Sequence, residues 1–152
     1  MSPHRYAIDV EWTGDTGTGT SGYRDYRRTV TVRADGKHEL AGSADRAFRG
    51  DADRWNPEEL LVAALSQCHL LSYLHVAVQH GVVVTGYEDA ATAELETDRD
   101  GGGRLTRVDL HPRVRLADEG HRALADSLHD EAHRLCFIAN SVSVPVHHHP
   151  TA

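Results

Sequence analysis

The stretch "NPEELLVAALSQCHLLSYLHVAVQHG", from Asn56 to Gly81, predicts one long helix that decides the fold. Asn56 can cap its first turn, and Pro57 suits the first helical position because no intrahelical hydrogen bond is lost there. Glu58 and Glu59 place negative charge at the positive end of the helix dipole. Gly81 is a natural stop, because glycine readily adopts the left-handed conformation that ends many helices.

This helix is apolar or small on nearly every face, so we expect it to be covered all round. Its centre also carries polar side chains, at Ser66, Gln67, Cys68, His69 and Ser72. That pattern is too polar for a helix that faces lipid, so it favours a buried helix of a soluble protein. One small domain offers too little cover for such a helix. We therefore expect an obligate homodimer whose core includes it.

Composition narrows the class of protein. The chain has 152 residues, of which 26% are charged and 39% are apolar, and its net charge is -7. The negative charge argues against nucleic acid or an anionic membrane as partner. The opening "MSPHRYAIDVEW" lacks a basic region followed by an apolar core, so no signal peptide is expected and a cytoplasmic location is predicted.

The flanking sequence predicts an α+β fold with a mainly antiparallel sheet. We expect a single domain over 1–152. Alternating apolar residues predict strands, and a helical period of leucine and alanine predicts a second helix. Pro112 indicates an edge position or a bulge in its strand. The expected order is βββ-α-ββ-α-β, with strands near 5–12, 28–33, 38–40, 82–97, 105–116 and 141–146, and with helices over 56–81 and 118–136.

The histidines do not predict a metal site. His147, His148 and His149 are adjacent, and neighbouring residues of an extended chain point apart, so we expect a surface tail. His69 and His75 are six residues apart rather than the three or four that stack side chains on a helix. They are expected to be packed, hydrogen-bonded histidines, with His69 near the Cys68 pocket.

Cys68 and Cys136 are the two cysteines, and no CxxC motif joins them. A buried thiol that acts as a small apolar side chain is one interpretation of each. A reactive thiol is the other, and it requires a cation or hydrogen bond to offset desolvation of the thiolate. His69 points about 100° away from Cys68 around the helix and is not expected to fill that role.

The segment "NPEELLVAALSQCH" closely resembles the central-helix motif of the OsmC/Ohr family, in which a cysteine follows the helix-start glutamate by ten residues. Glu58 and Cys68 have that spacing, and "AHRLCFIANSVSVPV" places Cys136 where the family ends its later helix. The resemblance implies an intertwined homodimer with a mainly antiparallel sheet wrapped around long central helices. Phe137 departs from the family pattern, which often has proline after the second cysteine.

The resemblance also implies a thiol peroxidase that reduces organic hydroperoxides without a metal, haem, flavin or other cofactor. Cys68 would be the peroxidatic cysteine and Cys136 the resolving cysteine, with a disulfide recycled by a dithiol reductant such as a dihydrolipoyl group. A non-catalytic module that binds an apolar ligand, and a thiol redox sensor, remain as alternatives.

The family pairs the helix-start glutamate with an arginine. Glu58 carries over directly, and Arg24 in "GYRDY" is the first choice for its partner, with Arg46 and Arg49 as alternatives. Ten residues of helix span about 15 Å, so Glu58 cannot touch Cys68 of its own chain. The Glu58–arginine pair near each Cys68 is therefore expected from the other subunit, which makes the active sites shared.

Overall fold

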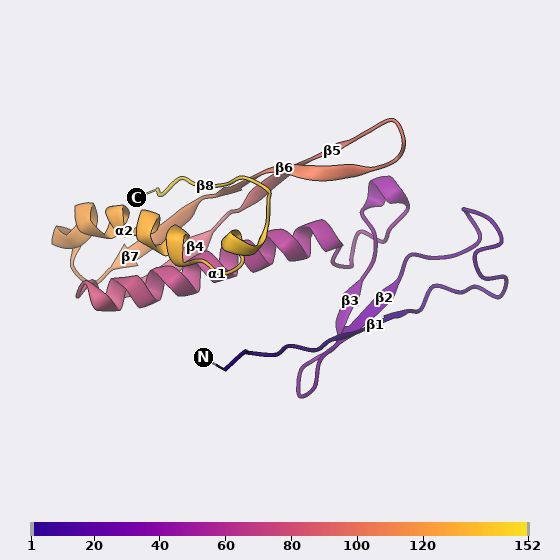
Figure 1. Ribbon diagram of the computed structural model, residues 1–152, viewed down its shortest axis with the longest axis horizontal. Helices are drawn as coiled ribbons and strands as arrows, with labels where there is room; N and C mark the ends of the chain where they lie inside the picture. Colours follow the sequence, from indigo (N-terminus) through magenta and orange to yellow (C-terminus); the bar gives the residue numbers. More distant parts are fainter. Residues whose placement is uncertain (1, 152) are drawn as a thin grey trace. The chain divides into compact units, whose positions relative to one another are not determined.

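The computed structural model describes residues 2–151, in two compact units of which one ends at Leu60 and the other begins at Leu61. The α+β class and the mainly antiparallel pairing are confirmed. The helices and strands, shown in Figure 1, are β1 (Asp9–Trp12), β2 (Val30–Arg33), β3 (Leu40–Gly42), η1 (Arg46–Phe48), α1 (Pro57–Gln79), β4 (Val84–Asp89), β5 (Thr92–Thr97), β6 (Gly103–Leu110), β7 (Pro112–Leu116), η2 (Glu119–His121), α2 (Arg122–Leu135), η3 (Ala139–Ser141) and β8 (Val146–His148). The expectation of a single domain stays a prediction.

The first unit is a three-stranded antiparallel sheet in the order β1-β2-β3. Arg33 of β2 pairs with Glu11 and Glu39 on either side, at 2.7 and 2.6 Å. The first strand, predicted over 5–12, forms only over Asp9–Trp12, and all four of its residues are exposed. Tyr6 and Ile8 are 92% and 64% exposed. One apolar face of the predicted strand is therefore bare in the single chain.

Both ends of α1 form as the sequence predicts. The Asn56 carboxamide accepts from the Glu59 N–H at 2.8 Å, while Glu59 accepts from the Asn56 N–H at 3.2 Å, so the two residues form a capping box. At the other end Gly81 has φ 71°, and the Val82 N–H bonds to the Ala77 carbonyl at 2.9 Å. This is a Schellman motif, which requires the left-handed conformation at Gly81.

The two long strands expected at 82–97 and 105–116 are each divided in two. β4 pairs with β7, and β5 pairs with β6, both antiparallel. The two pairs of strands are separated at Asp89 and His111. There the Asp89 carboxylate accepts a hydrogen bond from the His111 N–H at 2.7 Å, in place of a backbone hydrogen bond between the strands. Pro112, which has no N–H to donate, begins β7 directly after this break. β7 forms a two-stranded sheet with β4, which agrees with the predicted edge position of Pro112.

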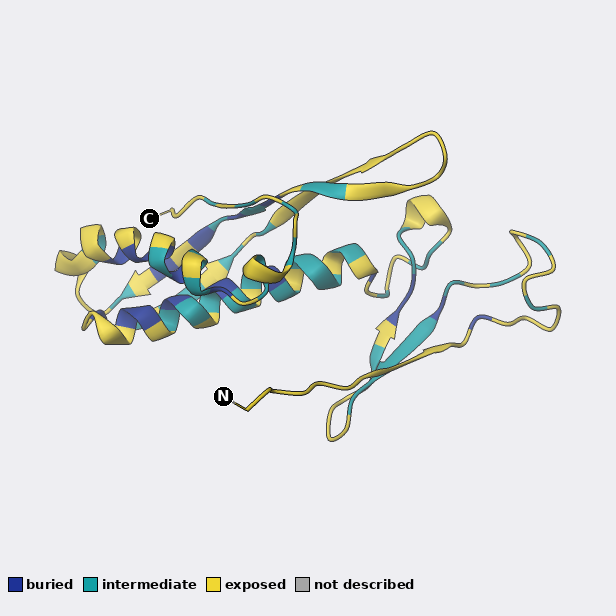
Figure 2. Cartoon of the chain, in the orientation of Figure 1, coloured by how far each residue is buried: buried dark blue, intermediate teal, exposed yellow. Residues whose placement is uncertain are grey.

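The second unit is built around α1 and α2. One apolar cluster joins Tyr73, Val76 and Ala77 of α1 to Ala125, Leu128 and Ala132 of α2, with Val82 and Val114. A second cluster is formed by Leu65, Val108 and Leu110, against which Val142, Val144 and Val146 pack. Figure 2 shows the resulting stripe of buried residues along α1 and α2. The helices thus share one core face, as their leucine and alanine spacing predicts.

The C-terminal strand does not lie where the sequence predicted it. Residues 139–141 form η3, and the strand β8 begins only at Val146, where it pairs in parallel with Val108 to Leu110 of β6. Val142 and Val144 still pack on the core, although no strand forms there. The expected surface position of the three histidines is confirmed for His147 and His149, which are exposed, and is wrong for His148. β8 turns His148 inward, where it is half-buried, and leaves His147 exposed.

α1 is long and apolar enough to cross a membrane by length and composition alone, a test that the core helix of a soluble protein also passes. Its packed face consists of Leu65, His69, Tyr73, Val76 and Ala77. Leu71 and Val78 on other faces are 57% and 79% exposed. The cover that was expected all round the helix is therefore incomplete in the single chain.

Candidate active site at two cysteines

Cys68 and Cys136 come together in the second unit. Cys68 lies near the middle of α1 and is half-buried, whereas Cys136 follows the last residue of α2 and is buried. The Cys68 side chain lies beside the Cys136 thiol, close enough to raise the pKa of that thiol. Both cysteines are free thiols in this structure. Two residues distant in sequence thus form one dithiol pair.

The two thiols differ in their surroundings. The pKa of Cys136 is raised to about 11, chiefly by burial and in smaller part by the neighbouring Cys68, while the Ala139 N–H opposes the rise. That N–H donates to the Cys136 sulfur at 3.4 Å. Cys136 therefore remains a neutral thiol at neutral pH. Of the pair, the half-buried Cys68 is the sulfur that a small molecule can reach.

The end of α2 fixes the backbone of Cys136. Its N–H bonds to the His133 carbonyl at 3.2 Å, and its own carbonyl accepts from the Asn140 N–H at 3.1 Å. Phe137, which stands where the family often has proline, is 81% exposed. The chain after Cys136 is thus tied down by hydrogen bonds of the η3 turn rather than by a proline ring.

Glu58 lies in the first turn of α1 and is half-buried. Its Oε2 atom is buried and has no hydrogen-bond partner among residues 2–151. Arg24, Arg46 and Arg49 are all exposed, and within the described chain none of them forms an ion pair with Glu58. The pairing of Glu58 with one of these arginines stays a prediction.

Four histidines gather beside the dithiol pair, and the sequence predicted only one of them there. His69 is 1% exposed, and its Nε2 lies 3.0 Å from Nδ1 of His129, which is equally buried. His148 of β8 lies with its ring centroid 5.5 Å from that of His69, and His133 lies 5.4 Å from His148. The expectation of a packed, hydrogen-bonded His69 is confirmed, but His75 is exposed and the same expectation for it was wrong.

These histidines do not converge on a common point. Among the residues described, no group of three or more histidine, cysteine, aspartate or glutamate side chains is arranged to hold a metal ion. Helical spacing does give a signal for His129 and His133, which are four residues apart on α2. The inward position of His148 carries no such local signal, because it depends on the pairing of β8 with β6.

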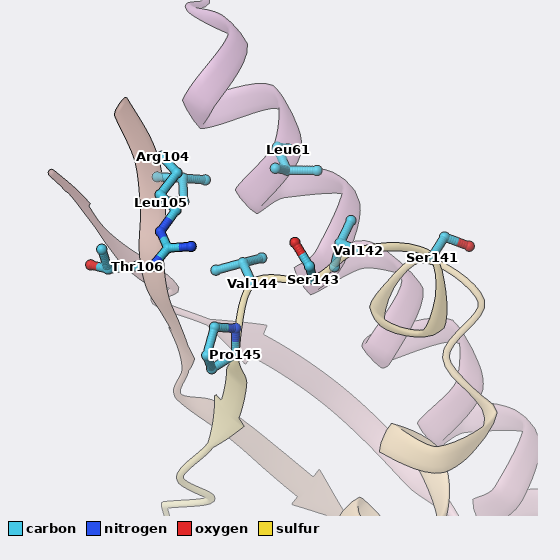
Figure 3. A pocket seen from close by; sticks show the side chains of 9 residues that line it. All are labelled: Leu61, Arg104, Leu105, Thr106, Ser141, Val142, Ser143, Val144 and Pro145. Atoms are coloured by element: carbon cyan, nitrogen blue, oxygen red, sulfur yellow. The ribbon is translucent and has the colours of Figure 1, made fainter. Parts of the chain in front are cut away.

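A groove of about 620 Å³ lies between the start of α1, β6 and the segment before β8. Figure 3 shows Leu61, Val142 and Val144 lining it with Arg104 at one side. Neither cysteine lines this groove. Leu65, one turn before Cys68, is buried in the core and takes no part in it. The groove and the dithiol pair are therefore separate features of the second unit.

Solved structures of similar fold cover nearly the whole chain. An OsmC-like protein of unknown function from Vibrio cholerae is 28% identical, with a TM-score of 0.87, and the match covers 98% of this chain and 100% of that one. The organic hydroperoxide resistance protein OhrB of Bacillus subtilis is 22% identical, with a TM-score of 0.67 and coverage of 96% and 98%. An organic hydroperoxide resistance protein OsmC from Legionella pneumophila is 21% identical, with a TM-score of 0.72 and coverage of 99% and 100%.

A comparison with curated protein sequences gave no significant match. The family profile described as OsmC-like protein matches residues 50–149, which include all of α1 and α2 and both cysteines. The matched region is about two thirds of the chain, and the fold agrees with it over the remainder. The chain therefore belongs to the OsmC-like protein family.

Proposed function

We propose that this protein is a cysteine-based peroxidase that reduces organic hydroperoxides, with Cys68 as the peroxidatic and Cys136 as the resolving cysteine. The observation that carries the proposal is the meeting of a half-buried thiol on α1 with a buried thiol at the end of α2. The OsmC/Ohr fold supports a hydroperoxide-related redox role, and two of the similar structures are organic hydroperoxide resistance proteins.

In the first step the Cys68 thiolate attacks the terminal oxygen of the hydroperoxide. The O–O bond breaks, the alkoxide leaves and takes up a proton to become the alcohol, and Cys68 becomes a sulfenic acid. In the second step the Cys136 sulfur displaces the sulfenic oxygen, which leaves as water with the thiol proton. The product is a Cys68–Cys136 disulfide, and both electrons lost by sulfur have gone to the peroxide.

A dithiol reductant then exchanges with the disulfide and returns both cysteines to thiols, while it becomes a disulfide itself. A lipoyl-type dithiol has the required chemistry. An alkyl hydroperoxide is favoured over hydrogen peroxide because exposed apolar side chains, including Leu71 and Phe137, lie on α1 and directly after Cys136. Organic substrates gain from contact with such side chains, whereas hydrogen peroxide does not.

We further propose that the active protein is a homodimer with shared sites, as proteins of this family generally are homodimers. Leu71 and Val78 of α1 are exposed in the single chain, as are the apolar residues of the predicted first strand. The unpartnered Oε2 of Glu58 fits the same proposal, because a buried carboxylate oxygen without a hydrogen bond is costly. An arginine brought near Glu58 in the dimer, with Arg24 the first candidate, would satisfy it.

Steady-state consumption of cumene hydroperoxide with dihydrolipoamide tests the proposal. The wild-type protein should turn over repeatedly and should prefer cumene hydroperoxide to hydrogen peroxide. Cys68→Ser should lose turnover entirely, and a surface change such as His38→Ala, in the connection between β2 and β3, serves as a control that should retain it. Equal turnover by Cys68→Ser would contradict the proposal.

Two other outcomes correspond to the alternative functions. Oxidation of Cys68 by one equivalent of peroxide without further turnover indicates a redox sensor. The groove between α1 and β6 favours a ligand-binding module as the second candidate. Lack of any reaction at Cys68, together with saturable binding of a fatty acid that the apolar-to-charged change Val144→Asp abolishes, would support that module instead.

A further inference from the structure

The buried histidines beside the dithiol pair have no part in the proposed chemistry, yet they connect the two helices that carry the cysteines. His69 directly follows Cys68 on α1, and His129 lies seven residues before Cys136 on α2. Both are 1% exposed. Their mutual hydrogen bond satisfies one nitrogen of each ring, which offsets part of the cost of burial, whereas His69 Nδ1 and His129 Nε2 have no partner among the described residues.

The geometry of the pair is that of a well-formed hydrogen bond. The His69 Nε2 and His129 Nδ1 atoms are 3.0 Å apart. The two ring planes differ by only 7° while the ring centroids are 5.3 Å apart. A small interplanar angle with closely opposed nitrogens means that the rings lie side by side in a common plane rather than face to face. In that arrangement the N–H of one ring points along the lone pair of the other.

Tyr73 fixes the rotation of the His129 ring. Its own ring stacks on His129 with centroids 4.2 Å apart and planes 19° apart, and its hydroxyl donates to the Ala125 carbonyl at 3.0 Å. Two successive turns of α1, at His69 and at Tyr73, are therefore each hydrogen-bonded to α2. The contact between the helices is specified by directional polar bonds as well as by apolar packing.

A disulfide requires its two sulfur-bearing carbons to approach within a narrow range of distances. Cys136 belongs to the end of α2, and Cys68 belongs to α1 one residue before His69, so any shift of α2 along or around α1 changes the separation of the two sulfurs. The His69–His129 hydrogen bond is the polar contact between the helices that lies nearest to the cysteines in the described chain.

We propose that the His69–His129 hydrogen bond is a clamp that aligns α2 on α1 and thereby keeps Cys136 within bonding reach of Cys68. His69 and His129 are thus positioning residues, and they touch neither sulfur nor substrate. This proposal deepens the proposed function by naming what holds the resolving cysteine in place. It concerns the closing of the disulfide and not the attack on peroxide.

The clamp works with uncharged rings. The pKa of His69 is lowered to about 3 and that of His129 to about 4, in both cases chiefly by burial and in smaller part by neighbouring histidines. The groups that face the pair are His133 and Asp130 of α2, His148 of β8, and Tyr73 and Tyr87, which pack around the rings. Asp130 is bonded to His148 at 2.9 Å and is exposed to water. One neutral ring donates and the other accepts at ordinary pH.

The test measures the effective concentration of the Cys68–Cys136 pair by equilibrium with reduced and oxidised glutathione. His129→Leu removes the ring nitrogens, whereas His129→Asn keeps a polar atom near the position of Nδ1. The clamp predicts a fall of about tenfold or more in His129→Leu, the size expected from loss of one buried hydrogen bond, and a substantial rescue in His129→Asn. The glutathione equilibrium needs no peroxide, so it tests the clamp even if the protein is not a peroxidase.

A matched control removes a different contact between the same helices. His80, just beyond the end of α1, bonds to Glu131 of α2 at 3.0 Å, and both are partly exposed. His80→Leu should leave the effective concentration within about twofold of the wild-type value, because exposed pairs contribute little. A fall in His80→Leu equal to that in His129→Leu would show that the effect is general loosening, and would overturn the clamp.

Two further measurements keep the test decisive if a variant does not fold. If His129→Leu is unfolded by circular dichroism, His69→Met and His69→Gln give the same contrast from the α1 side. In the wild-type protein the effective concentration should stay constant from about pH 7.5 to about pH 5.5, a range in which ordinary histidines become charged. An unchanged effective concentration in the folded apolar variants overturns the proposal, and so does a steep fall of the wild-type value over that pH range.

Discussion

The Cys68 side chain, on α1, lies beside the Cys136 thiol, which directly follows α2. The chain between the two cysteines forms the second half of α1, four strands and all of α2. Packing of α1 and α2 in one apolar cluster brings them together. The fold thus places the two thiols next to each other, as a peroxidatic and a resolving cysteine would need to be.

Replacement of the resolving cysteine should separate the two chemical steps. In Cys136→Ser, peroxide should still oxidise Cys68, but the sulfenic acid has no thiol to condense with and should persist or go on to the sulfinic acid. Labelling with dimedone followed by mass spectrometry detects the sulfenic acid. If Cys136→Ser recycles at the wild-type rate with a dithiol reductant, Cys136 is not the resolving cysteine.

The shared active site predicts complementation between two inactive variants. Cys68→Ser lacks the nucleophile, and Glu58→Gln lacks the carboxylate that is proposed to act on the other subunit. Mixed dimers of the two should recover about a quarter to a half of wild-type turnover, because one of their two sites holds both residues. Each variant alone, unfolded and refolded in the same way, is the control. No recovery in dimers shown to be mixed would mean that each chain works alone.

Acid should destabilise the fold through the buried histidines. The pKa of His69 is lowered to about 3 and that of His129 to about 4, from an ordinary value of 6.5, chiefly by burial. Below pH 6.5 these histidines bind protons in the unfolded chain but not in the folded chain. Their contribution to the free energy of unfolding is therefore intact above pH 6.5 and is lost as the pH falls towards about 4. Each histidine should lower the free energy of unfolding by at most about 1.4 kcal/mol per pH unit there.

Urea unfolding at a series of pH values checks this prediction. The double variant His69→Gln, His129→Asn should show a shallower decline between about pH 6.5 and about pH 4, since amides do not titrate. His38→Gln, at an exposed position in the connection between β2 and β3, is the matched control and should keep the wild-type slope. Identical slopes in the double variant and the wild type would show that the two histidines are not the cause.

The N-terminal capping box should contribute to stability on its own. Asn56→Ala removes the acceptor of the Glu59 N–H and should lower the free energy of unfolding by about 1 kcal/mol. Asn56→Asp, which keeps an acceptor oxygen, should remain within a few tenths of a kcal/mol of the wild type. Denaturant unfolding of the three proteins measures the difference. A full loss in Asn56→Asp would point to a role of the carboxamide other than capping.

The sequence could predict features that depend on local chemistry. Both ends of α1 follow from Asn56 and Gly81, and the irregularity in the later hairpin follows from Pro112, because each residue limits its own backbone. The approach of Cys136 to Cys68 was available only through family resemblance. No spacing within the chain specifies how α1 and α2 pack.

Features that depend on distant pairing could not be predicted locally. The valines at 142, 144 and 146 alternate as in a strand, but β6 offers a partner only from Val146 onward, so β8 includes His148. That shift turned an expected surface tail into one side of the histidine cluster. Likewise the alternation at Tyr6 and Ile8 marks an apolar face without saying what covers it, and within this chain both are exposed.

Disulfide mapping after a single turnover tests the central claim most directly. Reduced protein is mixed with one equivalent of cumene hydroperoxide, alkylated at once, digested and analysed by mass spectrometry. The account predicts rapid loss of both thiols and a peptide pair linked through Cys68 and Cys136 of the same chain. Persistence of both free thiols while the peroxide disappears, or linkage of Cys68 to anything other than Cys136, would contradict it.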